Sequence, residues 1–138
     1  MDNLQRARAS LSIDEDDLVP AEITALLGAE PWLGVAKGEV FIAHDGRQVQ
    51  ARTGKWIFGN DWVSPPDLDL QIAALFEALS KDASVWIELS RRFHCYVSVG
   101  GYFSDWTGGM TLSPATLSLL AERGLAIDFD LYAPSASY

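Results

Sequence analysis

Apolar and polar residues alternate over residues 125–132, near the end of the chain. The apolar positions are Leu125, Ile127, Phe129 and Leu131, and the positions between them are Ala126, Asp128, Asp130 and Tyr132. A period of two predicts a strand with one face toward the core and the other carrying two acids and a phenol. Before this strand, Ser113 suits a helix cap, Pro114 the first helical position and Gly124 the left-handed residue that ends a helix. The chain therefore closes with a helix followed at once by a strand.

The same periodicities predict the other elements. Strand patterns cover residues 4–13, 40–44, 47–52, 55–58 and 94–103, and helical patterns cover 20–28, 68–81 and 85–92. The predicted sheet is polar on one face, and the few predicted helices cover the other. This combination indicates a two-layer α+β sandwich of ferredoxin-like type. Its sheet is expected to be mixed, mostly antiparallel and of about five strands. The pattern leaves the strand order open.

Local signals refine three places in this scheme. Asp45-Gly46 between two strand patterns predicts a hairpin with a two-residue type I′ turn. Gly54 indicates a bulge or a break before the next strand. Ser84 is expected to cap the helix over 85–92. Residues 29–39, with Pro31, Gly34 and Gly38, are expected to be irregular.

The five tryptophans divide by their context. Trp56 lies in a strand pattern and Trp86 on an apolar helix face, so both are predicted to be in the core. Trp32, Trp62 and Trp106 lie in predicted loops, where a large ring either plugs the edge of the core or anchors a partner. The general tendency of aromatic residues to be buried favours the plug.

Length and composition indicate one cytoplasmic globular domain over residues 1–138. The chain has 19 Asp and Glu against 10 Lys and Arg, a formal net charge of -9. This charge argues against nucleic acid as a partner and favours a partner with a basic surface, although solubility alone also explains it. Cys95 is the only cysteine, so an intramolecular disulfide is excluded, and no segment approaches the roughly 20 apolar residues of a membrane span.

One polar surface emerges if the first strand, the strand beginning at His94 and the last strand are neighbours. Its outward residues are then Arg6, Arg8, Ser10, His94, Tyr96, Ser98, Asp128, Asp130 and Tyr132. Converging Arg, His, Tyr and Asp side chains suit a polar ligand or acid–base chemistry. The alternative is an ordinary solvated sheet face, on which Asp128 and Asp130 balance Arg6 and Arg8.

A second candidate surface is formed by loop aromatics and nearby charges, namely Trp32, Lys37, Tyr102, Asp105 and Trp106. No catalytic residue is assigned, because Ser113 is explained as a cap and Cys95 is expected to face inward as a structural thiol. No metal site is expected from only two histidines, His44 and His94, without ligand spacing. The glycine-rich residues 100–109 lack both a dinucleotide fingerprint and a phosphate-loop lysine, so no cofactor is expected.

Several motifs follow one another in a family-specific order. They are the run from Pro20 to Pro31 with its Leu-Gly-x-x-Pro turn, the Lys37-Gly38 pair, Trp56, Leu112-Ser113-Pro114 and the Asp-x-Tyr ending at Tyr132. In this order they resemble the bacterial domain of unknown function 4279 family over almost the whole chain. Val19 replaces the usual polar residue before the first helix, and the Asp45-Gly46 hairpin is longer than the family pattern. The resemblance implies no established activity, cofactor or catalytic residue, and some related small domains are proposed to be immunity proteins.

These observations favour a non-enzymatic protein-binding domain, with an immunity-like role, whose acidic surface and the aromatics around Trp106 hold a protein partner. The alternative is a small-molecule enzyme or sensor on the polar sheet face, with His94 and Tyr96 as acid–base candidates and Arg6 or Arg8 as an anion clamp. A third hypothesis is a homodimer through the open sheet face or an edge strand.

Overall fold

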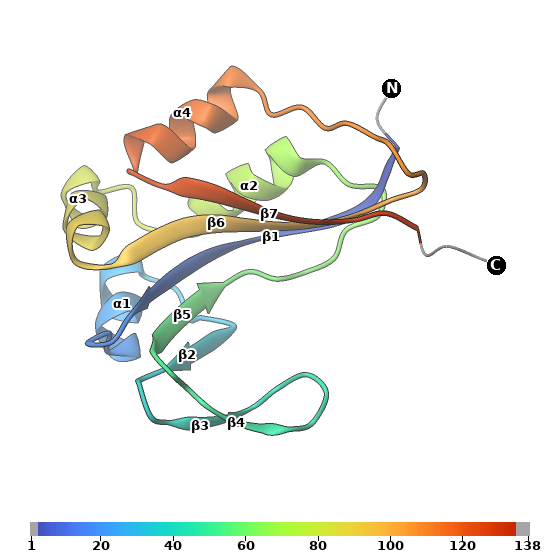
Figure 1. Ribbon diagram of the computed structural model, residues 1–138. Helices are drawn as coiled ribbons and strands as arrows, with labels where there is room; N and C mark the ends of the chain where they lie inside the picture. The colour runs from blue at the N-terminus through green and yellow to red at the C-terminus, as the bar shows by residue number, and fades with distance from the viewer. Residues whose placement is uncertain (1–2, 135–138) are drawn as a thin grey trace.

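Four helices cover one face of a five-stranded sheet in the computed structural model, which describes residues 3–134 (Figure 1). The strand order is β2-β5-β1-β6-β7, and a separate hairpin is formed by β3 and β4. The strands are β1 (Leu4–Glu15), β2 (Leu33–Val35), β3 (Val40–Ile42), β4 (Gln48–Gln50), β5 (Gly54–Phe58), β6 (His94–Phe103) and β7 (Ala126–Tyr132). The helices are α1 (Pro20–Leu27), α2 (Leu68–Glu77), α3 (Ala83–Arg92) and α4 (Pro114–Glu122). The α+β class and the mixed five-stranded sheet are confirmed.

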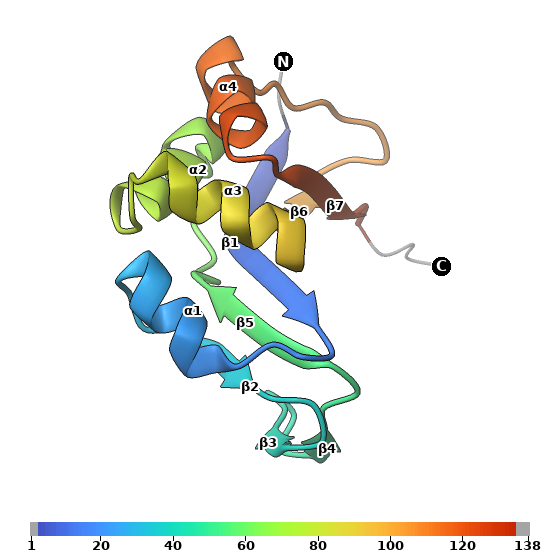
Figure 2. The same ribbon diagram turned by 90° about the vertical axis from the view of Figure 1, so that its left-hand side faces the viewer.

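β1 is the centre of the sheet because it pairs on both sides. Leu11 lies opposite Phe58 of β5 and opposite Val97 of β6, both in antiparallel register. The alternation in β1 directs Ala7, Leu11 and Ile13 into the core, where none is more than 1% exposed. The helices all lie on one face of the sheet (Figure 2), and the side chains that alternate with these core residues along β1 belong to the other face. The sequence pattern therefore determines which face of the central strand is open.

The helices begin and end largely at the predicted residues. Ser113 caps α4 by accepting a hydrogen bond from the Thr116 N–H, and Gly28, with a φ of 78°, ends α1 in the left-handed conformation. Asp82, not Ser84, caps α3, because its carboxylate accepts from the Ser84 N–H. Trp56 and Trp86 lie in the core as expected, at 0% and 3% exposure.

β6 and β7 are parallel neighbours joined through α4. In a ferredoxin-like fold another strand lies between the two parallel strands that a helix connects, whereas β6 and β7 are direct neighbours. The ferredoxin-like type is therefore not confirmed. Because β7 is at the sheet edge, Phe129 and Leu131 remain about half exposed, whereas Leu125 before the strand is buried. The predicted apolar face of the last strand is thus buried only at its beginning.

Two local expectations are corrected, and the alternatives at Gly54 are decided. Ala43 accepts a hydrogen bond from Gly46 N–H and donates to Arg47 C=O, and of the central residues only Gly46 has a positive φ. This is a three-residue turn ending in a left-handed glycine, not a type I′ turn. Of the bulge or break expected at Gly54, the structure has the break, because residues 51–53 belong to no strand and Gly54 begins β5 in register with Glu15, where a Cβ would lie 2.8 Å from the Glu15 carbonyl oxygen. β2 lies within the segment expected to be irregular.

Candidate functional site

The three strands that carry the predicted polar surface are neighbours, in the order β1-β6-β7. The register places Arg8 opposite Gly100, Ser10 opposite Ser98, and Ser98 beside Asp128. All the outward residues named from the sequence therefore share the open face, namely Arg6, Arg8, Ser10, His94, Tyr96, Ser98, Asp128, Asp130 and Tyr132. The structure brings the polar surface together as a continuous face.

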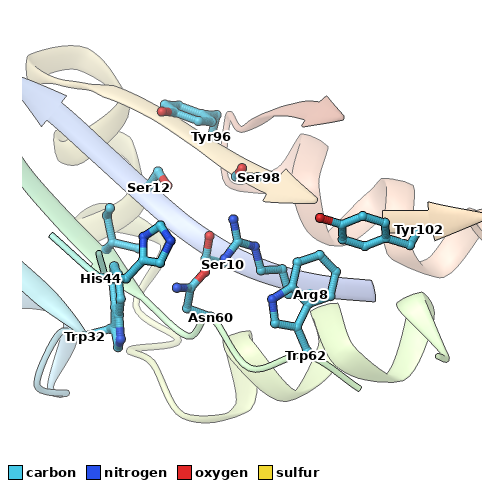
Figure 3. A pocket seen from close by; sticks show the side chains of 11 residues that line it. Arg8, Ser10, Ser12, Trp32, His44, Asn60, Trp62, Tyr96, Ser98 and Tyr102 are labelled. Carbon is cyan, nitrogen blue, oxygen red and sulfur yellow. The ribbon is translucent and has the colours of Figure 1, made fainter. Parts of the chain in front are cut away.

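A cleft of about 550 Å³ lies on this face (Figure 3). Its lining comes from three strands, from the turn of the β3–β4 hairpin and from the loops before β2 and after β5. The lining residues are Arg8, Ser10, Ser12, Trp32, His44, Ile57, Asn60, Trp62, Tyr96, Ser98 and Tyr102. This volume is in the range of small-molecule binding sites.

The floor of the cleft is made of small residues on β1 and β6. Ser10 and Ser12 are each only 6% exposed, although they are polar and point away from the core. On β6, Gly100 leaves room for the side chains above it, because a Cβ at this position would lie 3.2 Å from Arg8 Nε and 3.3 Å from Trp62 Cη2. Small side chains at these positions leave room above the sheet.

The loops that carry Trp32 and Trp62 are held to the sheet by backbone hydrogen bonds. Trp32 N–H donates to the Ile57 carbonyl oxygen at 2.7 Å, which fixes the loop before β2. Ala7 and Val63 exchange two backbone hydrogen bonds of 3.1 and 2.9 Å, which hold the loop carrying Trp62 against β1. These two walls therefore have a defined position relative to the floor.

Both arginines of the open face stack on aromatic rings. The Arg6 guanidinium lies 4.7 Å from the Trp62 ring and 4.3 Å from the Tyr102 ring, and that of Arg8 lies 4.9 Å from Trp62. Tyr102 in turn stacks on Tyr132 with ring centroids 4.9 Å apart. Within residues 3–134, neither arginine forms an ion pair. The expected balance of Arg6 and Arg8 by direct pairing with Asp128 and Asp130 is therefore wrong.

Asp130 has a different partner on its own strand. The Tyr132 hydroxyl donates to Asp130 Oδ2 at 2.6 Å, and this bond to the carboxylate raises the pKa of Tyr132 above its usual value. The tyrosine thus stays protonated as a donor at neutral pH. This pair occupies Asp130 and leaves Arg8 without a carboxylate.

Polar side chains without partners gather in the cleft. In the described part of the chain, the side chains of Ser10, His44, Asn60 and Ser98 make no hydrogen bond within the protein, and Arg8 stacks on Trp62 and interacts electrostatically with Tyr132. Polar groups on a folded surface normally bond to protein or to water. Converging groups of this kind can be satisfied together by one polar ligand.

His94 lies beside Asp14, outside the residues that line the cleft. Its Nδ1 is 3.3 Å from Asp14 Oδ1, and its ring centroid is 4.6 Å from that of Tyr96. Burial, followed by the nearby Asp14 charge, raises the pKa of Tyr96, so its hydroxyl remains a proton donor at neutral pH. The acid–base pair expected from the sequence is adjacent, but only Tyr96 faces the cleft.

The second predicted surface is not a single surface. Trp32 and Tyr102 line the cleft, whereas Lys37 forms an ion pair with Asp16 at 3.0 Å. The Asp105 carboxylate accepts from the Trp106 N–H, and the Trp106 side chain is exposed.

The loop tryptophans do not plug the core. Trp32 is 59% exposed and Trp106 is 66% exposed, so the plug expected from the sequence is wrong for both. Trp62 is 36% exposed and packs on the open face against Arg6, Arg8 and Tyr102.

The sequence patterns do not predict five of the lining residues as part of a site, namely Ser12, His44, Ile57, Asn60 and Trp62. Asn60 and Ile57 carry no local sequence signal, and His44 is a candidate from the sequence only for a metal site. Over residues 3–134 no group of three or more His, Cys, Asp or Glu side chains is arranged to hold a metal ion. Cys95 faces inward as expected, and burial raises the pKa of its thiol to about 12.

A comparison with protein-family models finds one family, described as Domain of unknown function (DUF4279), which matches residues 5–134. The chain therefore belongs to this family. Neither the curated proteins nor the solved structures include a significant match. None of the helices in residues 3–134 has the length and apolar character needed to cross a membrane.

Proposed function

We propose that this member of the DUF4279 family is a small-molecule-binding protein whose site is the cleft on the open face of the sheet. The observation that carries the proposal is the cleft of about 550 Å³ itself, into which polar side chains from distant segments converge, from Arg8 and Ser10 on β1 to His44 on the hairpin turn. Trp32 and Trp62 add exposed aromatic surface at the rim. A few converging polar groups within aromatic walls are typical of ligand sites.

The proposed role is binding without catalysis, as in a sensor. His94, the strongest acid–base candidate, lies outside the lining of the cleft. Tyr96 has a raised pKa, which disfavours it as a base at neutral pH. The remaining lining groups are suited to hold and orient a ligand.

A library of metabolites screened by thermal melting tests this proposal. Ser98→Tyr fills the floor, and Ser118→Tyr adds the same side chain on the exposed surface of α4 as a matched control. Compounds that raise the melting temperature of the wild type should also raise that of Ser118→Tyr and leave Ser98→Tyr unchanged. A screen without stabilising compounds, or one in which Ser98→Tyr responds like the wild type, would contradict the proposal.

Protein binding is the second candidate function, and an immunity-like role is its specific form. It is supported by the exposed Trp106 and by the net charge of -9, which suits a partner with a basic surface. Affinity purification from the native host should recover a basic protein with the wild type, and Trp106→Ala should lose it. Recovery of the same proteins with both chains would count against this role.

The proposed setting is the bacterial cytoplasm, supported by the free thiol of Cys95. A homodimer through β7 is a further proposal, supported by Phe129 and Leu131, which are half exposed at the sheet edge. Cell fractionation tests the first point. Light scattering of the wild type and of Leu131→Arg tests the second, because only the wild type should show the mass of a dimer.

A further inference from the structure

The cleft has a charge opposite to that of the whole protein. The chain carries a formal net charge of -9, yet the residues that line the cleft include Arg8 and His44 and no Asp or Glu. Because the lining itself adds no carboxylate and Arg8 forms no ion pair among the described residues, its charge is a local source of positive potential in an acidic protein. The lining therefore favours an anionic group over a cationic one.

Arg8 is positioned to receive such a group. Its guanidinium stacks on Trp62 at 4.9 Å and extends toward the middle of the cleft, where Figure 3 shows its end among the floor residues. Stacking occupies the flat face of a guanidinium and leaves its N–H edges free to donate. A planar fork of donors matches the two oxygens of a carboxylate.

Two hydroxyls lie next to this cation on the floor. Ser10 and Ser98 are direct cross-strand partners, one step along the same face from the Arg8–Gly100 pair. Opposed side chains on one face have Cβ atoms roughly 5 Å apart. Neither hydroxyl has a hydrogen-bond partner in residues 3–134, so both can donate to the same anion.

The neighbouring strand limits the charge of the ligand. Asp128 and Asp130 of β7 lie beside Ser98 and Gly100 on the same face. These carboxylates repel a second negative charge, while one arginine neutralises only one. The site is therefore suited to a monoanion, such as a carboxylate, over a phosphate dianion.

The aromatic walls indicate the rest of the ligand. Trp32 and Trp62 come from different loops and stand at opposite sides of the cleft (Figure 3). Ile57 adds an apolar contact at the floor. Exposed indole rings gain most from a flat, apolar group that covers them.

From this arrangement we infer that the ligand is a small carboxylic acid with a planar ring. Its carboxylate binds Arg8, which Trp62 holds in place, and the Ser10–Ser98 hydroxyls, and its ring lies against the exposed ring of Trp32. The inference rests on the proposed function and adds the chemical class of the ligand.

Matched pairs of probes test the inference. Each aromatic acid, for example benzoate, phenylacetate or indole-3-acetate, is titrated by calorimetry alongside its uncharged primary amide. The acids should bind at least about tenfold more tightly than the amides, as one charge-assisted hydrogen bond implies. Arg8→Gln should reduce the affinity for the acids to that for the amides and leave the amides unchanged.

Two further variants complete the test. Arg91→Gln removes the same charge from an exposed position on α3, outside the cleft, and should bind like the wild type. Arg8→Lys keeps the charge without the planar fork and should fall between the wild type and Arg8→Gln. A folded far-ultraviolet spectrum for each variant establishes that binding, not folding, has changed.

The outcomes separate the two proposals. Equal affinity for acids and amides, or an equal loss of both in Arg8→Gln, overturns the carboxylate inference and leaves a cleft that binds neutral compounds. If neither the probes nor the metabolite library binds to the wild type, the proposed function itself fails.

Discussion

The Arg8 guanidinium lies 4.9 Å from the ring of Trp62, on the face of the sheet that no helix covers. Trp62 also holds Arg6 at 4.7 Å and contacts the ring of Tyr102 at 5.3 Å. One loop tryptophan thus orders two arginines from β1 and a tyrosine from β6. This cluster gives the open face a fixed shape.

Trp62→Ala should measurably destabilise the fold, although this tryptophan is not in the core. It removes two cation–π contacts, which contribute about 0.5–1 kcal/mol each at exposed sites, so we expect a loss of about 1–2 kcal/mol. Urea unfolding followed by circular dichroism measures this change. Trp106→Ala is the control, since its ring is largely exposed, and should change the free energy of unfolding by less than about 0.5 kcal/mol. Equal effects of the two variants would show that the cluster does not stabilise the loop.

Gly100→Ala should weaken ligand binding without unfolding the protein. The new Cβ would lie 3.2 Å from Arg8 Nε and 3.3 Å from Trp62 Cη2, so both side chains must move. These atoms belong to flexible or partly exposed side chains, and the stability cost should stay below about 1 kcal/mol. Affinity for a ligand found in the screen should fall about tenfold, as expected when one charge-assisted hydrogen bond is misaligned. Gly109→Ala, where a Cβ would meet nothing within 4 Å, should bind normally.

Asp69→Asn should reduce the dependence of stability on acid pH. The Thr116 hydroxyl and then the Ser113 N–H donate to Asp69, at 2.5 and 3.0 Å, and these bonds hold the pKa of Asp69 below its usual value. A lowered pKa stabilises the fold above the pKa of the unfolded chain, about 3.9, and this contribution is lost as the pH falls through the lower folded value.

Urea unfolding between pH 7 and pH 2.5 measures this effect. Asp69→Asn should lose about 1 kcal/mol at pH 7 and decline less steeply in acid than the wild type. Asp61→Asn, at an exposed loop position, should follow the wild-type curve. A curve for Asp69→Asn parallel to that of the wild type would mean that the link between α2 and α4 does not depend on the carboxylate charge.

Cys95 should be inert in the folded protein. Its side chain is 7% exposed, its thiol donates to the Leu89 carbonyl oxygen at 3.5 Å, and burial raises its pKa to about 12. Alkylation by iodoacetamide at pH 8 should therefore be at least about 100-fold slower than in urea, where the thiol regains a pKa near 8.5. Comparable rates in both conditions would place the thiol outside the core.

The alternation of apolar and polar residues is enough to predict the open face. β1 and β6 keep a period of two over many residues, so Arg6, Arg8, His94 and Tyr96 lie on one side of the sheet. The caps of α4 were also predictable, since Ser113 and Gly124 act on bonds within their own turns. Local chemistry of this kind is fully present in the sequence.

The cleft was not predictable in the same way. Its walls depend on pairings between distant segments, such as Trp32 with Ile57 and Ala7 with Val63, and no local pattern encodes them. The hairpin turn shows a related limit, because Asp45-Gly46 suits both a type I′ turn and a turn that ends in a left-handed glycine. Arg6 and Arg8 stack on Trp62, and the residues next to Trp62 in the sequence do not determine where its ring lies.

The indole N–H signals of the five tryptophans in an ¹H–¹⁵N spectrum test most directly whether the open-face cleft binds a ligand. Trp56 and Trp86 are internal references, because their indole N–H groups donate to Thr24 Oγ1 and to the Ser80 carbonyl oxygen inside the fold, and Trp106 is an exposed reference outside the cleft. Titration with a compound found in the screen should shift the signals of Trp32 and Trp62 and leave the other three in place. Shifts confined to Trp106, or spread equally over all five signals, would contradict binding in the cleft.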